Sequence, residues 1–186
     1  FGWAFFNVYV PLDTTIFGIR AETSGSPGLR ANAITNAQGT FAVGIYTTGP
    51  VTPTIKGNSI QGIQARDGTD AVGAGTPGGD GGLAIGILVD GGSSATVMSN
   101  MVDSLRAGRG GNGAPNSGGA GGRGGNGGSA AGIVLANVGR ADVGWNIVTN
   151  LSGGRGGMGG SGSGTATGGN GGDAGDATAC QILNTA

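Results

Sequence analysis

The sequence repeats one arrangement of residues four times, and this repeat restricts the fold more than any other feature. Each unit begins with a glycine followed by an isoleucine, and an asparagine recurs 14 positions after the glycine. The four glycines are Gly18, Gly44, Gly86 and Gly132, so the units start 26, 42 and 46 residues apart. A constant pattern with variable spacing indicates one structural unit plus inserts. Such a unit must stack on its neighbours to bury its apolar face.

The repeated positions predict short strands rather than helices. Apolar residues, mostly β-branched, recur 11, 16 and 19 positions after each glycine, and no sustained spacing of three and four appears. Strands of successive units can therefore pair in parallel and in register. The asparagines form one column, which we expect to point inward and to bond from unit to unit as a structural ladder. That column consists of Asn32, Asn58, Asn100 and Asn146.

The Gly-Ile pairs, the Ile/Val columns and the asparagine column together resemble the right-handed parallel β-helix of the pectate-lyase-like superfamily. The resemblance covers nearly the whole chain outside the inserts. It implies an all-β fold, namely a right-handed parallel β-helix solenoid of about five coils, with residues 1–186 forming a single domain. It does not imply an activity, because this fold carries enzymes, phage tailspikes, adhesins and inert fibres.

The inserts are glycine-rich and occupy the same place between successive units. Glycine makes up 47 of the 186 residues, and three tracts, residues 65–82, 107–128 and 152–176, hold most of it. We therefore expect all three to emerge from one corner of the solenoid. Their Gly-Gly-x rhythm predicts a polyglycine II bundle, in which extended segments with three residues per turn pair sideways through their backbones. A flexible glycine linker is the alternative.

The composition excludes several classes of function. The chain has no histidine, which removes the usual triad nucleophiles and zinc sites, and its net charge of −1 argues against nucleic-acid binding. No apolar run is long enough to span a membrane. No cofactor is predicted. The single cysteine, Cys180, is expected to be a small buried apolar residue in the column of Phe17 and Val43.

Acidic residues supply few candidates for chemistry. The segment before Asp173 matches half of a calcium-binding nonapeptide repeat, so Asp173 and Asp176, with Asp80 from another insert, are the candidate calcium ligands. Asp103 and Asp142 fall at different positions of their units and do not stack as a catalytic cluster would. We therefore predict that the chain is not an enzyme.

The two ends of the sequence carry the candidate subunit interface. The pattern places Gln181-Ile182 at the next Gly-Ile position, 49 residues after Gly132, and Asn7 fits the asparagine column. Aromatic residues crowd the first 46 positions. We expect the ends of two copies to complete one shared coil, with a fragment of a longer solenoid as the alternative. The expected interface residues are Phe1, Trp3, Phe5, Phe6, Tyr9, Ile182 and Leu183.

The sequence thus predicts a non-enzymatic, extracellular or cell-surface structural protein whose partner is itself. Copies would join head to tail by β-strand addition into a filament or surface fibre. The first alternative is a glycan-binding adhesin or tail-fibre-like module. A polysaccharide-active β-helix enzyme and an ice-binding protein are further alternatives. The ice-binding alternative needs a regular threonine ladder, and Thr47 and Thr48 have no counterparts in later units.

Overall fold

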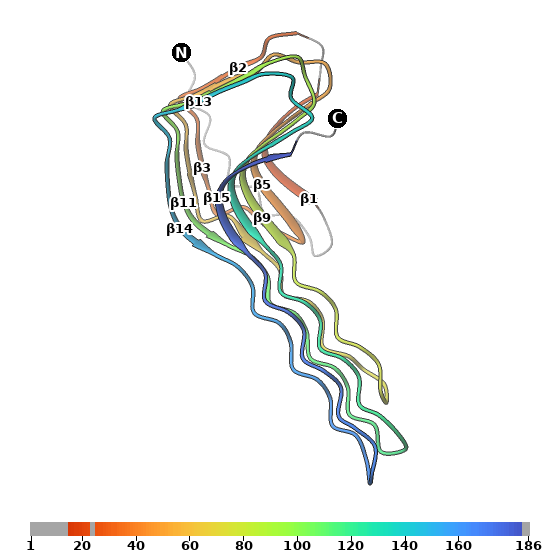
Figure 1. The fold of residues 1–186 in the computed structure, drawn as a ribbon. Helices are drawn as coiled ribbons and strands as arrows, with labels where there is room; N and C mark the ends of the chain where they lie inside the picture. The colour runs from red at the N-terminus through yellow and green to blue at the C-terminus, as the bar shows by residue number, and fades with distance from the viewer. Residues whose placement is uncertain (1–14, 23–24, 184–186) are drawn as a thin grey trace.

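The computed structural model describes residues 15–22 and 25–183, and within these residues the chain is all-β with three parallel sheets (Figure 1). The first sheet orders β1 (Thr15–Ala21), β5 (Phe41–Thr48), β9 (Leu83–Asp90), β12 (Ala130–Ala136) and β15 (Ala177–Leu183). The second orders β2 (Gly28–Arg30), β6 (Thr54–Lys56), β10 (Ala95–Met98) and β13 (Ala141–Gly144). The third contains β3 (Ala33–Thr35), β7 (Ser59–Gln61), β11 (Met101–Arg106), β14 (Ile147–Ser152), β4 (Gln38–Gly39) and β8 (Gln64–Ala65).

The chain visits the three sheets in turn and then returns to the first, so successive units lie side by side. The predicted register is confirmed for the four units, because Ile19, Ile45, Ile87 and Ile133 pair in one row of the first sheet. Parallel strands joined by long crossovers that always return to the same sheets are compatible with a parallel β-helix or solenoid.

The predicted register is wrong for the last strand. Thr178 pairs with Ala131 and Cys180 pairs with Ile133, so Ala179 holds the glycine position. The last spacing is therefore 179 − 132 = 47 residues instead of 49. Side chains alternate with a period of two, so a shift of two residues keeps the same alternation and the sequence pattern alone does not detect it.

The glycine column marks a bend at which the side-chain alternation breaks. The pairing in the first sheet skips Gly18 and its counterparts, and the residue before each glycine lies on the outer face while the isoleucine after it enters the core. A Cβ on Gly44 would approach Ile60 Cγ2 to 2.6 Å, and one on Gly86 would approach Val102 Cγ1 to 2.4 Å. The glycine therefore makes room for the β-branched residue 16 positions later.

Corners of the units use left-handed backbone. Positive φ angles occur in one column just before the third sheet and in a second column within it, and most of these positions are not glycine. One column holds Ala31, Gly57, Ser99 and Trp145, and the other holds Asn36, Gly62, Ser104 and Asn150. Asparagine and glycine tolerate this conformation well. A tryptophan with φ of 57° is unusual, since bulky residues seldom adopt it.

The core lies between the three sheets and is aliphatic. Its fully buried members include Ile45, Ile55, Ile60, Ile87 and Leu105, and the alanines of the core lie near the ends of strands. A smaller cluster on the outer face of the first sheet contains Val43, Ile85, Ala131 and Val134. The column predicted to hold Cys180 belongs to this outer cluster. Cys180 itself is exposed and lies in the isoleucine column, so that prediction is wrong on both counts.

The asparagine column forms a continuous hydrogen-bonded ladder inside the units. The backbone N–H and the Nδ2 of Asn58 both donate to Asn100 Oδ1, at 3.0 and 2.8 Å. Asn32 bonds to Asn58 in the same way, and Asn100 bonds to Asn146. In Asn58, Asn100 and Asn146 the side-chain amide also donates to a strand carbonyl, as from Asn100 Nδ2 to Ile55 O at 3.0 Å. Asn58 and Asn100 are buried, so the ladder satisfies polar groups that water does not reach.

The three inserts leave one corner together and form a long arm (Figure 1). Each runs out, turns and returns, with turns at 74–75, 117–118 and 164–165. At one level of the arm, a zigzag of backbone bonds crosses all six segments. It links Thr69, Gly79, Gly111, Gly125, Gly157 and Gly172, at 2.8–2.9 Å. The three sheets and their core form the body of the molecule. A parallel zigzag three residues nearer this body links Arg66, Gly82, Gly108, Gly128, Gly154 and Gly175.

Glycine is required in the arm because the backbones nearly touch. A Cβ on Gly125 would lie 1.9 Å from Gly79 O, and one on Gly156 would lie 1.9 Å from Gly172 O. No side chain fits at such distances. The hydrogen bonds recur every three residues, and this is the period of the Gly-Gly-x pattern.

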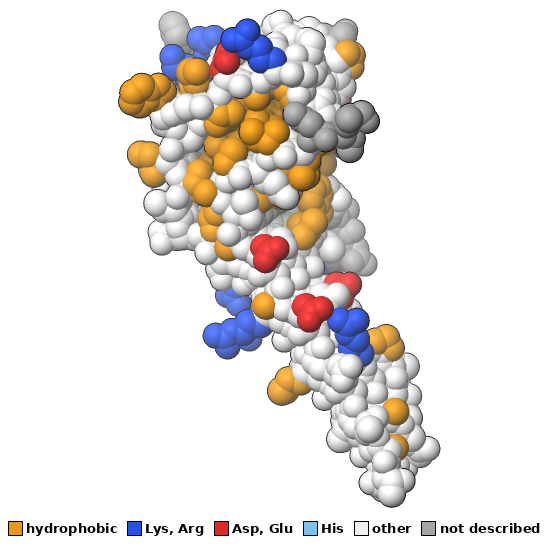
Figure 2. Space-filling view, in the orientation of Figure 1, with side chains coloured by type: hydrophobic (Ala, Val, Ile, Leu, Met, Phe, Trp, Pro, Cys, Tyr) orange, Lys and Arg blue, Asp and Glu red, His pale blue; other side chains and the backbone are white. Residues whose placement is uncertain are grey.

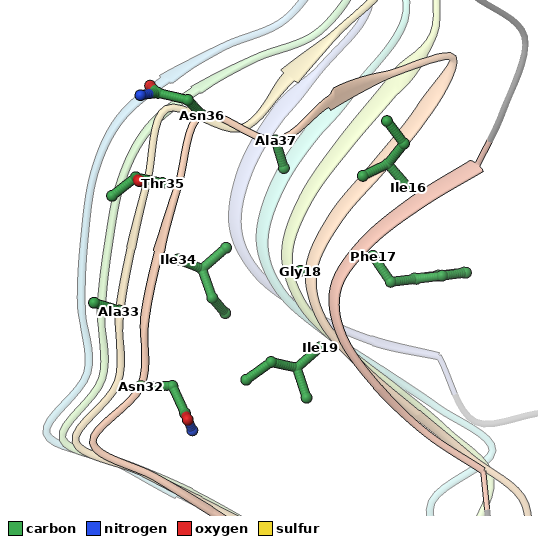
Figure 3. Close-up of a pocket in the computed structure, with 10 residues that line it drawn as sticks. All are labelled: Ile16, Phe17, Gly18, Ile19, Asn32, Ala33, Ile34, Thr35, Asn36 and Ala37. Carbon is green, nitrogen blue, oxygen red and sulfur yellow. The ribbon is translucent and has the colours of Figure 1, made fainter. Parts of the chain in front are cut away.

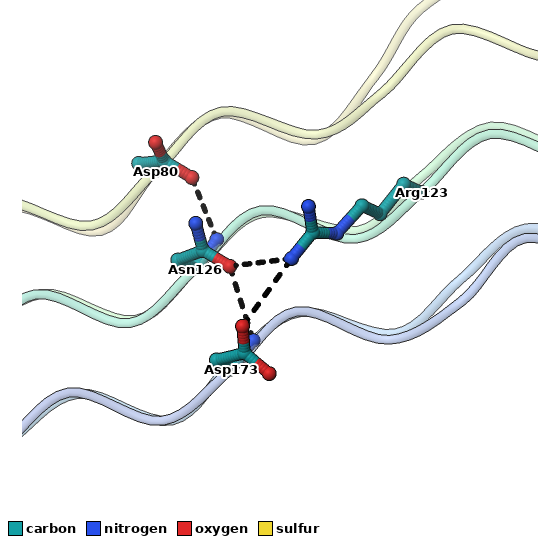
Figure 4. A network of polar contacts seen from close by, with 4 residues as sticks. All are labelled: Asp80, Arg123, Asn126 and Asp173. Carbon is teal, nitrogen blue, oxygen red and sulfur yellow. Dashed lines mark hydrogen bonds and ion pairs between the residues drawn. The ribbon is translucent and has the colours of Figure 1, made fainter.

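The third residue of each Gly-Gly-x triplet faces outward but also bonds to the neighbouring segment. Asp80 Oδ1 accepts the backbone N–H of Asn126 at 2.7 Å, and Asn126 Oδ1 accepts that of Asp173 at 3.1 Å (Figure 4). Asp67 and Asp70 cap the amides of Arg109 and Asn112 in the same way. Short side chains with an oxygen at this position therefore satisfy outward-pointing backbone amides of several triplets in the neighbouring segment.

Candidate assembly interface

The strands β13, β14 and β15 form an end face on which core positions are uncovered. Val97 and Leu135 are completely buried, whereas Val143 and Ile182, their counterparts on the last strands, are 38% and 59% exposed. The apolar residues gather on the body in Figure 2, above the arm. The exposed members of the end face are Val143, Trp145, Ile147, Cys180, Ile182 and Leu183.

Trp145 and Ile147 are end-face residues that sequence reasoning did not select. Trp145 is 86% exposed in the corner column that elsewhere holds alanine, glycine or serine. Ile147 is 59% exposed and pairs with Met101, in the row that begins with Ala33 and Ser59. Trp145 is the only aromatic residue in its column, and Ile147 is the largest apolar residue in its column. A comparison of the outward-facing columns of the repeat, as well as the inward-facing ones, would have identified both.

Polar groups of the end face also lack protein partners within the described residues. β15 bonds to β12 through one edge, and its other edge has no strand partner within the described residues. Asn146 accepts the two bonds of Asn100 and donates from Nδ2 to Val97 O at 2.8 Å. The backbone N–H and one side-chain amide hydrogen of Asn58 donate to Asn100, and those of Asn100 donate to Asn146. The corresponding groups of Asn146 therefore face the uncovered side of the stack.

The opposite end of the described sheets opens into the core. A cavity of about 70 Å³ lies between β1 and β3, and Ile16, Ile19 and Ile34 point into it while Phe17 points away (Figure 3). β1 pairs with β5 and, among the described residues, has no partner on its other edge. The two ends of the stack thus carry complementary features, since each presents one unpaired strand edge and aliphatic core side chains.

Several residues predicted from the sequence can be placed only in part. Ile182 and Leu183 lie on β15, 59% and 46% exposed, and they pair with Leu135 and Ala136. Phe1, Trp3, Phe5, Phe6, Asn7 and Tyr9 lie outside the described residues. Desolvation raises the pKa of the Cys180 thiol, so at neutral pH it stays protonated and offers an apolar surface.

The acidic candidates do not assemble into a metal site. Asp173 lies beside Arg123 at 3.4 Å, and the segment that carries Asn126 separates it from Asp80 (Figure 4). Among the described residues, no three histidine, cysteine, aspartate or glutamate side chains lie together as metal ligands. The Asp80 carboxylate instead caps a backbone amide of the arm, and the Asp173 carboxylate pairs with Arg123.

The most elaborate polar cluster surrounds Asp103 in the third sheet. Its Oδ1 accepts from Thr149 Oγ1 at 2.8 Å and from Asn150 Nδ2 at 2.7 Å, and its Oδ2 accepts from Ser104 Oγ at 2.8 Å. These bonds, chiefly that of Thr149, lower the pKa of Asp103 below its ordinary value. The side chain is solvated and its partners are hydroxyls and an amide, so the cluster fastens β11 to β14 across an exposed surface.

Comparison with protein-family models, with curated protein sequences and with solved structures finds no match for this chain. Across the residues that the structure describes, no helix has the length and apolarity needed to cross a membrane.

Proposed function

We propose that this chain is a non-enzymatic structural subunit that joins copies of itself end to end into an extracellular filament or surface fibre. In this proposal the body is a right-handed parallel β-helix of about five coils, and the arm is a polyglycine II bundle. The observation that carries the proposal is the end face, where an unpaired strand edge and uncovered core side chains coincide.

Strand addition would satisfy both features at once. If β15 pairs with β1 of the next copy, the first sheet continues without interruption, and Cys180 and Ile182 face Ile19 and Ala21 of that copy. Burying a Val, Leu or Ile side chain completely contributes about 1.5–3 kcal/mol, and the main chain adds its ladder bonds. Because the two ends differ, this contact is heterologous and open, so it repeats into a fibre.

The axial repeat follows from the number of strands. Each copy contributes five strands to the first sheet, and parallel neighbours lie about 4.8 Å apart, so the repeat should be about 24 Å. A low net charge and a surface rich in glycine, serine and threonine favour an extracellular location. The arm would then project sideways once in every repeat.

Electron microscopy of the purified chain tests the proposal. The parent chain should form fibres with the repeat of about 24 Å. Ile182→Asp should leave soluble single subunits, because a carboxylate would be buried against the next copy. Val72→Asp is the matched control, since Val72 is an apolar residue 93% exposed on the arm, and it should still form fibres. Single subunits of the parent chain at high concentration, or fibres of Ile182→Asp, would overturn the proposal and favour a monomeric adhesin.

A further inference from the structure

The asparagine ladder has a direction, and this direction gives the two ends of the stack different chemistry. Asn32, Asn58 and Asn100 each donate two N–H groups to the Oδ1 of the next asparagine, so the donors always point towards the C-terminal units. The end face therefore terminates in donors, at Asn146. The incoming unit must present an amide oxygen at that height of the stack to satisfy them.

The remaining contacts of the end face can form in more than one register of the incoming copy. Aliphatic residues such as Val143 and Ile182 pack against any apolar neighbour of similar size, and main-chain ladder bonds form in any register that differs by two residues. Trp145 and Ile147 are exposed and lie on the rim. The Asn146 donors are different, because a buried N–H without an acceptor costs about 1–3 kcal/mol.

We infer that Asn146 determines the register and the partner of the subunit interface, by requiring the incoming copy to supply a side-chain amide oxygen in the ladder position. This inference rests on the proposed end-to-end assembly. In the ladder register, the asparagine column continues across the interface, and the incoming copy accepts a hydrogen bond from each of the two Asn146 donors. A copy shifted by two residues along the strands buries these two N–H groups without an acceptor. The sequence pattern alone predicts that Asn7, 25 residues before Asn32, belongs to the asparagine column; Asn7 lies outside the described residues.

The single cysteine allows the register to be measured directly. In the ladder register Cys180 faces Ile19 of the next copy, and after a shift of two residues it faces Ala21. Parallel neighbours about 4.8 Å apart fall within the Cα separation that a disulfide accepts. Fibres of Ile19→Cys should therefore cross-link under mild oxidation into covalent ladders. Fibres of Ala21→Cys should not.

The test introduces Asn146→Ala into both cysteine variants and compares the yields. The preference for cross-linking at position 19 over position 21 should fall at least tenfold. Asn146→Asp provides a second variant, because it keeps an oxygen for Asn100 but has no side-chain donor. It should lower the preference for position 19 as Asn146→Ala does. Asn170→Ala, at an exposed position of the arm, is the matched control and should keep the parent preference.

The outcomes separate this inference from the proposed function. Fibres of both Asn146 variants that cross-link at position 19 as strongly as the parent would overturn the inference alone, since assembly would stand without its register residue. A parent chain that forms neither fibres nor cross-links would overturn both. Circular dichroism and melting of each variant confirm that the unassembled body is folded before the comparison is made.

Discussion

The body and the arm use glycine for the same purpose but are stabilised by opposite means. In the body, one column of glycines admits an Ile or Val from the third sheet, and aliphatic side chains fill most of the core. In the arm, most glycines of the Gly-Gly-x triplets exclude a Cβ, and the segments are joined by their backbones. Side-chain burial should therefore govern the stability of the body, and backbone contact that of the arm.

The largest expected effect is the loss of a core side chain from the body. Ile87→Ala removes a fully buried residue at the centre of the first sheet, so we expect the free energy of unfolding to fall by about 3–4 kcal/mol. Met158→Ala, which truncates an exposed residue of the arm, should change it by less than about 0.5 kcal/mol. Chemical denaturation measures both. Equal effects would show that the arm, too, depends on its side chains.

A polar substitution inside the body should rank second. Asn100→Ala removes a buried rung and leaves the N–H of Asn58 and the carbonyl of Ile55 without their partners. The expected cost is about 2–3 kcal/mol. Asn126→Ala is the matched change in the arm, where the same side chain is solvated, and it should cost less than about 1 kcal/mol. A fully stable Asn100→Ala variant would mean that the ladder contributes nothing to folding.

The third prediction reverses the roles of the two regions. Gly156→Val would place a Cβ 1.9 Å from Gly172 O, and Gly121→Val would place one 2.0 Å from Gly160 O, so either should force segments of the arm apart. We expect about 1–3 kcal/mol of local destabilisation with little change in the melting of the body. Hydrogen exchange should show loss of amide protection confined to the arm. Met158→Val, at a position that faces outward, is the control and should leave protection intact.

The sequence predicted most of the repeat because each column has a single physical cause. The glycine, isoleucine and asparagine columns recur because a close contact, a core position and a buried hydrogen bond recur, and all three were placed correctly in four units. The last strand was misplaced because Ala179 replaces the glycine that marked the register. Without that marker, Gln181 fitted the alternating pattern as well as Ala179 did.

Other features of the structure have no periodic signal in the sequence. The outer-face position of Phe17 and Val43 follows from the bend at the glycine, and a strict alternation of side chains cannot reveal it. The left-handed corners include Ala31 and Trp145, neither of which is a turn signal by residue type. The amide caps of Asp67, Asp70 and Asp80 depend on which insert lies beside which, and that order appears only in the folded arm.

The smallest expected effect is on the stability of the body at acid pH, and it compares the parent chain with a variant of Asp103. The bonds from Thr149, Ser104 and Asn150 lower the pKa of Asp103 in the folded protein, so Asp103 stabilises the fold above its unfolded pKa, near ~4. That contribution is lost as pH falls through the lowered folded pKa. Asp103→Asn keeps an oxygen for Thr149 and Asn150 but does not titrate. Between pH 5 and pH 2 the melting temperature of the parent should therefore fall slightly more than that of the variant, while the other carboxylates act equally in both. If the melting temperatures of parent and variant changed in parallel with pH, protonated Asp103 would hold Thr149, Ser104 and Asn150 as well as the carboxylate does. The hydrogen bonds would then not favour the charged form.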